Sequence, residues 1–375
     1  MTHTADAVVI GGGITGISVA LHLAKAGLSV TLLEKGHLGG GPTGRSLAVI
    51  SQHYTDPTLV KLARTSLEIF SHFSEHYKGS AGFVKTGLVV LVPPAQTQSL
   101  HQTVEMQQGL GVQVSVFNAT GLASLDARLC TDDVGLASYQ PGAGYADPVQ
   151  TMATLTARAR EAGVDLREQT SAVGLKTGSS THTVETSGLD GELEISTPVV
   201  IDCAGPWAAQ VAQWVGLTLP LVSCRQVMAV LQRPSDFGVP HLSVNDFVHG
   251  TSFRTQGSDT FVGWFDRGQT QDPIDPDQFD DSVPGERLAP LQQKWQKRYP
   301  SSQPAILRGG WSGLYDVTPD WMPIIDQIGP EGFYVCCGHS GHGFKFGPYL
   351  GQLMTQWITQ APPTELKPLG LSRFA

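Results

Sequence analysis

Three glycines early in the chain are spaced as in a turn that binds phosphate groups. Gly11, Gly13 and Gly16 form the pattern G-x-G-x-x-G directly after the apolar run 8–10. The first glycine permits the tight bend, the second lets the backbone approach a pyrophosphate, and the third lets helix and strand pack closely. The following helix would offer free N–H groups and its positive dipole end to the phosphates. We therefore expect a bound dinucleotide; the alternative is an ordinary glycine-rich turn.

An acidic residue ends the second strand of the same unit. Glu34 follows the apolar strand 29–33 and comes roughly 20 residues after the first glycine, the usual distance for the acid that binds a ribose. Its carboxylate would accept hydrogen bonds from the ribose hydroxyls. We also expect Ile14, Thr15 and Lys35, which flank these positions, to contact the dinucleotide.

A second glycine-rich turn, Gly338-His339-Ser340-Gly341-His342-Gly343-Phe344-Lys345-Phe346, follows the predicted strand 332–337. Such a turn, opening a helix, directs N–H groups towards an anion or a polarised carbonyl. Lys345 would add a cation there. The alternative is a solvated lysine, the commoner state of this residue type.

The elements that must position these turns alternate strands with helices. Apolar periodicity predicts helices over 14–26, 58–77, 148–162 and about 347–359, and a buried strand over 198–203. The stretch from 222 to about 268 is rich in strands and is typical of an antiparallel sheet. We therefore predict an α/β fold with an α+β second domain. A Rossmann-like domain would comprise 1–80, 145–220 and 305–375, and a substrate domain 81–144 and 221–304.

Composition narrows the class of protein. The chain has 375 residues, 41% of them hydrophobic and 15% charged, as in a soluble enzyme with two domains. A net charge of −9 argues against nucleic acid as a partner. The five cysteines show no C-x-x-C spacing, and no metal site is expected. Residues 1–6 are too short and polar for a signal peptide, and no apolar run is long enough to span a bilayer, so we expect a cytoplasmic protein.

Two further segments complete a recognisable set: Thr43-Gly44-Arg45-Ser46 and Cys203-Ala204-Gly205-Pro206-Trp207. With the two glycine turns, they resemble the D-amino-acid oxidase superfamily of FAD-dependent oxidoreductases, in particular its sarcosine and glycine oxidase branch. The resemblance covers essentially the whole chain in order. Its most specific part is the run S-G-H-G-F-K at 340–345.

The resemblance implies roles for individual residues in binding FAD. Arg45 and Ser46 would contact the flavin, and Ala204, Gly205 and Trp207 would form a second nucleotide-contacting turn. A packing turn with a core tryptophan is the alternative for that segment. The backbone of Val173 would meet the adenine. The flavin would also contact the C-terminal turn at Gly338, Gly341, His342, Gly343, Phe344 and Lys345. Lys345 would in addition help to hold a substrate carboxylate.

The chain departs from the family pattern at two positions. Some relatives tether the flavin through a cysteine where this chain has Gly313, so we expect FAD to be bound without that link. Relatives of the sarcosine-oxidising type have an arginine for the substrate carboxylate where this chain has Ser51. Arg254 is a candidate replacement, because its planar fork suits a carboxylate; a salt bridge at the rim is the alternative. Further candidate polar residues around the substrate are His53, Tyr54, His249 and Tyr315.

These features predict an enzyme that oxidises a small primary or secondary amine or amino acid of the sarcosine, glycine or N-alkyl type. Hydride transfer to FAD would give an imine that hydrolyses, and dioxygen would reoxidise the flavin. Lys345, His53, Arg254 and Tyr315 would act on the substrate. The alternatives are an FAD dehydrogenase of the same fold that passes electrons to a quinone or partner protein, an NAD-dependent dehydrogenase, and a flavin-binding subunit without activity. The oligomeric state is left open.

Overall fold

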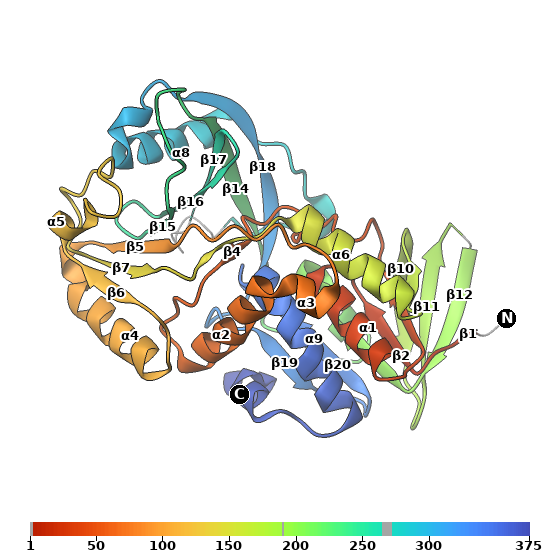
Figure 1. The fold of residues 1–375 in the computed structure, drawn as a ribbon. Coiled ribbons are helices and arrows are strands. Elements are labelled where there is room, and N and C mark those ends of the chain that lie inside the picture. Colours follow the sequence, from red (N-terminus) through yellow and green to blue (C-terminus); the bar gives the residue numbers. More distant parts are fainter. Residues whose placement is uncertain (1–2, 190, 265–271) are drawn as a thin grey trace.

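The N-terminal glycine turn lies at the carboxyl edge of a six-stranded sheet (Figure 1). The structure, a computed structural model, describes residues 3–189, 191–264 and 272–375. The strands of this sheet in spatial order are β19 (Ile324–Gln327), β20 (Phe333–Cys337), β13 (Val199–Asp202), β2 (Ala7–Ile10), β3 (Val30–Leu33) and β9 (Asp165–Arg167). All neighbours are parallel except β19 and β20. Helices cover one face of this sheet, and a smaller sheet with one short helix covers the other, so β2 and β3 are buried throughout.

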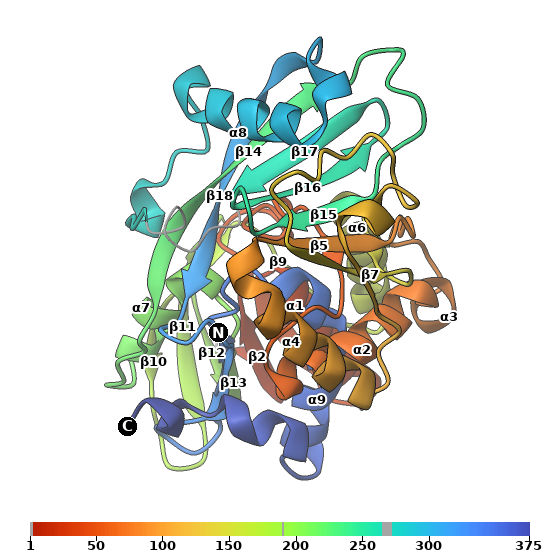
Figure 2. The same cartoon turned by 90° about the vertical axis from the view of Figure 1, so that its left-hand side faces the viewer.

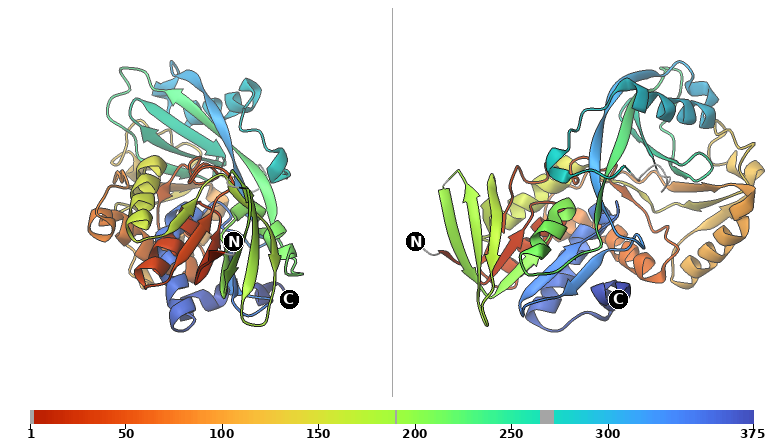
Figure 3. Two further views of the ribbon diagram at one scale, coloured as in Figure 1. Left: turned by 90° about the vertical axis from the view of Figure 1, so that its right-hand side faces the viewer. Right: turned by 180° about the vertical axis from the view of Figure 1, so that it is seen from behind.

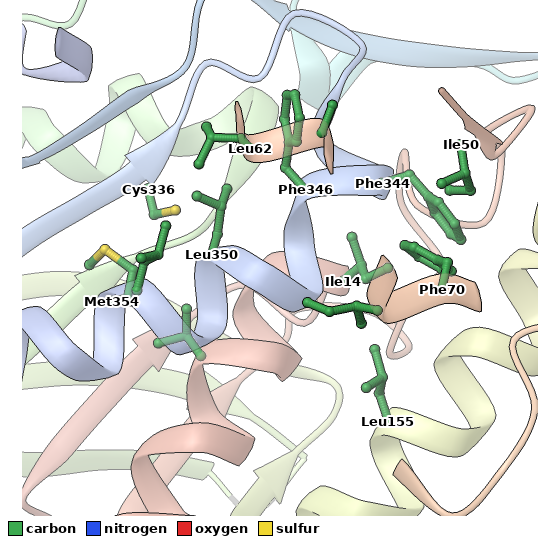
Figure 4. Close-up of a cluster of buried hydrophobic side chains, with 14 of the residues drawn as sticks. Ile14, Ile50, Leu62, Phe70, Leu155, Cys336, Phe344, Phe346, Leu350 and Met354 are labelled. Atoms are coloured by element: carbon green, nitrogen blue, oxygen red, sulfur yellow. The ribbon is translucent and has the colours of Figure 1, made fainter. Parts of the chain in front are cut away.

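Two helices begin at this edge and pack against each other. They are α1 (Ile14–Lys25) and α9 (Gly343–Thr359). Gly347 and Gly351, four residues apart and hence on one face of α9, lie against Ile14 and Ser18 of α1. A β-carbon at Gly351 would come within 2.6 Å of the Ser18 backbone, so the helices approach as closely as only glycine allows. Figure 4 shows the apolar core around this contact.

Seven further α-helices of the described residues pack around the sheets, and two of them begin at a capping aspartate. These are α2 (Pro57–Ser71), α3 (Phe73–Tyr77), α4 (Thr97–Gly109), α5 (Ala119–Leu122), α6 (Pro148–Glu161), α7 (Ala208–Gln213) and α8 (Gly285–Arg298). Asp56 and Asp147 cap α2 and α6 by accepting hydrogen bonds from backbone N–H groups, and a proline follows each. The helix predicted over 58–77 is interrupted at His72, whose backbone leaves the helical region.

A smaller sheet stands beside the six-stranded one. Its strands are β1 (His3–Thr4), β12 (Gly191–Thr197), β11 (His182–Gly188) and β10 (Thr170–Lys176). They project from one end of the molecule, next to the N-terminus (Figure 3). A two-stranded ribbon of β4 (Val49–Ile50) and β8 (Gly144–Tyr145) joins this region to the second large sheet.

The second large sheet has eight strands. In order they are β18 (Ile306–Val317), β14 (Val222–Gln232), β17 (Asp259–Trp264), β16 (Thr251–Gln256), β15 (Ser243–Asp246), β5 (Leu88–Val92), β7 (Leu136–Gln140) and β6 (Ser115–Phe117). All pairs are antiparallel except β15 with β5. One face packs on α8 through residues such as Phe253 and Trp295. The long strands β14 and β18 run down towards the six-stranded sheet (Figure 2).

The mixed α/β class expected from the sequence is confirmed, and two further details differ from the prediction. Strand β18 falls inside the segment 305–375, yet it pairs with β14 in the eight-stranded sheet. By sheet membership it therefore belongs with 221–304. Helix α9 begins at Gly343, earlier than the predicted start near 347. The part of the predicted strand-rich stretch at 265–268 lies outside the described residues.

Candidate functional site

A cavity of about 700 Å³ opens where the two large sheets meet. We call it the central cavity. Its walls are drawn from 10–15, 33–37, 40–47, 203–214, 276–279, 313–316 and 339–344, with Ser171, Ala172, Gln226 and Met228. These segments include both glycine turns and the turn at 203–207, although they are far apart in the sequence. The cavity is therefore the place where the predicted cofactor residues converge.

The N-terminal turn needs glycine for reasons that the structure makes explicit. Gly11 has φ +109°, a conformation that side chains disfavour, and a β-carbon there would lie 2.4 Å from the Cys203 carbonyl oxygen. A β-carbon at Gly16 would lie 1.9 Å from the Gly11 carbonyl oxygen. Gly13, by contrast, caps α1 and has only the Thr43 hydroxyl nearby. The N-terminus of α1 thus faces the cavity with a backbone that a phosphate group can approach.

Glu34 and Lys35 mark one end of the cavity. The Glu34 carboxylate accepts hydrogen bonds from the backbone N–H groups of Gly12 and Gly36, both at 2.7 Å. Lys35 Nζ lies 3.7 Å from the centre of the Trp207 ring and 2.8 Å from Asp277 Oδ1. Trp207 Nε1 also donates to Asp277, at 2.7 Å. The segment that carries Asp277 therefore covers this end of the cavity.

Two features of the wall fit a ligand that offers both hydrogen-bond donors and acceptors. Gly205 has φ +54°, and a β-carbon there would meet no atom within 4 Å, so its backbone is open to the cavity. Gln226 of β14 is 2% exposed, yet its amide oxygen and nitrogen have no partner among the described residues. Buried amides are normally hydrogen-bonded. The pyrimidine edge and ribityl chain of FAD carry donors and acceptors of the required kinds, so these residues fit the cofactor.

The turn before α9 forms the opposite wall. Gly338 and Gly341 have φ of +66° and +85°, and Asp316 Oδ2 accepts hydrogen bonds from the backbone N–H groups of Gly338 and His339. Gly341 lies against the Tyr315 ring, where a β-carbon would come within 2.5 Å of it. These contacts hold the turn against β18. It presents Gly341, Gly343 and Phe344 to the cavity at the N-terminus of α9.

Lys345, in the first turn of α9, lies within a group that we call the Lys345 cluster: Ser51, His53, Tyr54, Tyr315 and Lys345. Lys345 Nζ is 3.4 Å from Ser51 Oγ and 5.0 Å from the centre of the Tyr54 ring. Tyr315 lines the central cavity, so the cluster adjoins it. These side chains come from the segment after β4, from β18 and from α9.

The electrostatics of the Lys345 cluster follow from its burial. Burial disfavours charged forms, and it lowers the pKa of Lys345 to about 7. Burial, with a smaller effect of the Lys345 ammonium, lowers the pKa of His53 to about 4. Burial raises the pKa of Tyr315 to about 12 and that of Tyr54 well above its usual value. At neutral pH, Lys345 is therefore the member whose charge is most easily changed.

Most of the predicted cofactor-binding residues line the central cavity. They are Gly11, Gly13, Ile14, Thr15, Glu34, Lys35, Arg45, Ser46, Ala204, Gly205, Trp207, Gly341, Gly343 and Phe344. Gly16, Gly338, His342 and Lys345 lie in the same turns or helices but outside this lining. The Val173 side chain is 53% exposed; its neighbours Ser171 and Ala172 line the cavity instead.

Two predicted substrate residues lie elsewhere. Arg254 is 2% exposed, and its guanidinium donates to the carbonyl oxygens of Leu47 and Thr255 and to Gln256 Oε1. Arg254 does not line the central cavity. The three acceptors are uncharged, so these contacts are hydrogen bonds and not the salt bridge of the alternative interpretation. His249 lies on the α8 side, between Asp133 and Asp246.

Sequence patterns did not identify several residues that line the cavity, among them Gln226, Met228 and Asp277. Gln226 and Met228 occupy alternate positions of a strand, a pattern that does not reveal what the strand faces. Asp277 lies in an acidic segment that resembles an ordinary loop.

Among the described residues, no group of His, Cys, Asp and Glu is arranged to hold a metal ion. No described helix is long and apolar enough to cross a membrane.

Comparisons with known proteins agree with this geometry. Residues 6–357 match the family described as "FAD dependent oxidoreductase" (DAO). The chain is 25% identical to a glycine oxidase from Geobacillus kaustophilus, covering 100% of this chain and 98% of that protein. It is 26% identical to the mitochondrial sarcosine dehydrogenase of Mus musculus, covering 97% of this chain but only 40% of that protein.

Solved structures show the same architecture. The crystal structure of L-proline dehydrogenase from P. horikoshii superposes with a TM-score of 0.89 at 25% identity, covering 100% of this chain and 98% of that one. The glycine oxidase structure from Geobacillus kaustophilus superposes with a TM-score of 0.85. The resemblance inferred from the motifs is confirmed, and with it FAD as the cofactor. The chain belongs to the DAO family of FAD-dependent oxidoreductases.

Proposed function

We propose that this protein oxidises a small primary or secondary amine or amino acid of the sarcosine, glycine or N-alkyl amino acid type. The observation that carries the proposal is the partly buried Lys345 beside Ser51, at the helix N-terminus that borders the central cavity. When bound, FAD would supply the hydride acceptor; the substrate would lose a hydride from the carbon next to its amine nitrogen and become an imine that water hydrolyses. The names of the relatives, which act on glycine, sarcosine or L-proline, support this substrate class.

In this proposal the cofactor spans the central cavity. The turn at Gly11 and Gly13, with Glu34, would hold the ADP half, and Gly205 and the turn before α9 would contact the flavin. The cofactor domain would comprise 1–80, 145–220 and the part of 305–375 that follows β18. We propose that FAD is bound without a covalent link through position 313. Gly313 supplies no thiol there, and the Arg45 side chain lies close to where its β-carbon would be.

The Lys345 cluster would hold the substrate. The Lys345 ammonium and the Ser51 hydroxyl would bind the carboxylate, an attraction that is stronger in a buried site than in water. Tyr54 and Tyr315 are un-ionised at neutral pH, and burial raises their pKa values further. They would form uncharged walls that exclude water from the reacting carbon. Arg254 already donates to protein oxygens, so we assign the carboxylate to Lys345 instead.

We propose dioxygen as the electron acceptor. The alternative is a dehydrogenase that passes electrons to a quinone or partner protein. The names of two relatives, sarcosine dehydrogenase and L-proline dehydrogenase, keep that alternative open. A reading as an NAD-dependent dehydrogenase is superseded by membership of the FAD family.

An aerobic assay tests the proposal. The purified holoenzyme is incubated with N-methyl, cyclic and D-amino acids, and the carbonyl product and hydrogen peroxide are measured. We expect carbonyl product with at least one of them and peroxide in equal amount. Carbonyl product that requires an added quinone or dye, without peroxide, would identify a dehydrogenase.

Acid precipitation tests how the flavin is attached. It should release all of the FAD into solution; flavin that stays with the protein would contradict non-covalent binding.

A further inference from the structure

A chain of hydrogen bonds between buried amides ends at His53. The backbone N–H of Gln52 donates to Gln140 Oε1 at 3.0 Å, and Gln140 Nε2 donates to Gln107 Oε1 at 3.1 Å. Gln107 Nε2 then lies 3.3 Å from His53 Nδ1 and 3.1 Å from the Tyr54 carbonyl oxygen. Both glutamine side chains are essentially inaccessible to solvent. The chain joins α4, β7 and the segment after β4.

The direction of every hydrogen bond in this chain is fixed from its two ends. A backbone N–H can only donate, so the atom of Gln140 facing Gln52 is the oxygen, and its nitrogen faces Gln107. Gln107 must then accept through its oxygen and donate through its nitrogen. The Tyr54 carbonyl can only accept, which requires the same orientation of Gln107 independently. His53 Nδ1 is therefore an acceptor without a proton, and the neutral ring carries its one proton on Nε2.

We propose that His53 binds the substrate carboxylate as a neutral donor through Nε2–H, and that Gln107 and Gln140 are positioning residues that fix its tautomer. The proposal rests on the proposed function and names a further binding residue of the same site. His53 is partly exposed, and its ring lies near Lys345 and Phe247. With Nδ1 occupied by Gln107, Nε2 is the ring nitrogen left to meet a ligand.

A neutral donor suits this position for an electrostatic reason. A second cation beside Lys345 would raise the energy of both charges in a buried site. The pKa of His53, about 4, keeps the ring uncharged at neutral pH, so it can donate without repelling the ammonium. Ser51, where relatives of the sarcosine-oxidising type have an arginine, leaves the carboxylate with fewer donors. The Nε2–H group of His53 would supply one of the missing hydrogen-bond donors.

Two substitutions of His53 distinguish the role of the Nδ1 acceptor from that of the Nε2–H donor. His53→Asn keeps an acceptor near Nδ1 for Gln107 but removes the donor at Nε2, whereas His53→Gln can place an amide N–H near Nε2. The probe is acetate, titrated into the FAD-bound enzyme and followed by the change in the visible flavin absorbance. His101→Asn, an exposed histidine on the same helix as Gln107, is the control.

We expect His53→Asn to weaken acetate binding by about tenfold or more, the usual effect of losing a hydrogen bond to a charged group. His53→Gln should recover most of the affinity, and His101→Asn should match the wild type. Thermal unfolding checks that each variant is folded. Equal affinity in all four proteins, or equal loss in both His53 variants when they are folded, would overturn the proposal.

The tautomer is tested separately from substrate oxidation. In protein with ¹⁵N-labelled histidine, the resonances lost in His53→Asn identify the ring nitrogens of His53. We expect an unprotonated Nδ1 and a protonated Nε2 at neutral pH. The opposite tautomer, or a charged ring, would overturn the inference even if an amine is oxidised. Failure of every amine to react, with this tautomer and acetate binding intact, would instead count against the proposed function alone.

Discussion

The affinity of the site for a carboxylate should fall as the pH rises through neutrality, because Lys345 loses its proton there. Its pKa in the free site is about 7. A bound carboxylate favours the ammonium form and would raise that pKa by roughly two units, a typical effect of a contacting opposite charge. Binding therefore requires a protonated lysine that becomes scarce above pH 7. Between about pH 6.5 and about pH 8.5 the dissociation constant should rise roughly twentyfold, or about 1.8 kcal/mol.

The assay is a titration of the holoenzyme with acetate at both pH values, read from the visible flavin spectrum. Acetate stays ionised over this range. His53, with a pKa of about 4, and Tyr315, with a pKa of about 12, keep their protonation states as well. Lys345→Met should bind weakly at both pH values. Lys176→Met, which removes an exposed lysine paired with Glu185 and Glu194, should behave as the wild type.

Either of two results would refute this reasoning. One is an acetate affinity in the wild type that does not change between the two pH values. The other is a Lys345→Met variant that keeps both the affinity and its pH dependence. The first would mean that Lys345 does not titrate in this range, and the second that another group holds the carboxylate.

Three substitutions test packing and buried polar groups in the two large parts of the fold. Gly351→Leu should destabilise the protein by about 3 kcal/mol in chemical unfolding, because its β-carbon would meet the Ser18 backbone; unchanged stability would contradict the close packing of α1 and α9. Gln226→Leu should stabilise the apoprotein by about 1–3 kcal/mol, since it removes an unpaired buried amide, but should weaken FAD binding by about tenfold. An unchanged affinity for FAD would show that the amide is not a ligand group. Arg298→Met should cost about 3–5 kcal/mol in unfolding, because it leaves the buried Asp246 carboxylate without its guanidinium; a change below about 1 kcal/mol would argue that His249 alone balances that charge.

The half of the cofactor site around the first glycine turn was predictable because its signal is local. Gly11, Gly16 and Glu34 belong to one strand–helix–strand unit, so their spacing in the sequence is their spacing in the fold. The family resemblance extended this to the turns at 203–207 and 338–345. The contact between Gly11 and the Cys203 carbonyl oxygen joins two of these turns directly.

The wall contributed by the eight-stranded sheet could not be predicted in the same way. Strand β18 contains Gly309, Gly310 and Gly313, and glycine lowers strand propensity, so the segment did not look like a strand. Its pairing with β14 is what brings Gln226 to the cavity. The role proposed for Gln107 depends likewise on packing between α4 and β7, which periodicity does not reveal.

Arg254 shows why residue type alone is insufficient. A guanidinium suits a carboxylate, and the prediction rested on that chemistry. In the fold its Nε and Nη1 atoms donate to protein oxygens, and its Cζ atom lies 4.2 Å from the centre of the Tyr145 ring. This arrangement indicates a role in holding the segment before β4 against the eight-stranded sheet.

The central claim is that the Lys345 cluster presents an amine to FAD in the central cavity. Its most direct test is anaerobic mixing of the holoenzyme with N-methyl, cyclic and D-amino acids, each paired with the hydroxy acid of the same carbon skeleton where one exists. We expect at least one amino acid to abolish the visible absorbance of the oxidised flavin while its hydroxy acid does not. A flavin that stays oxidised with every amino acid, or is reduced equally by a hydroxy acid, would contradict the account.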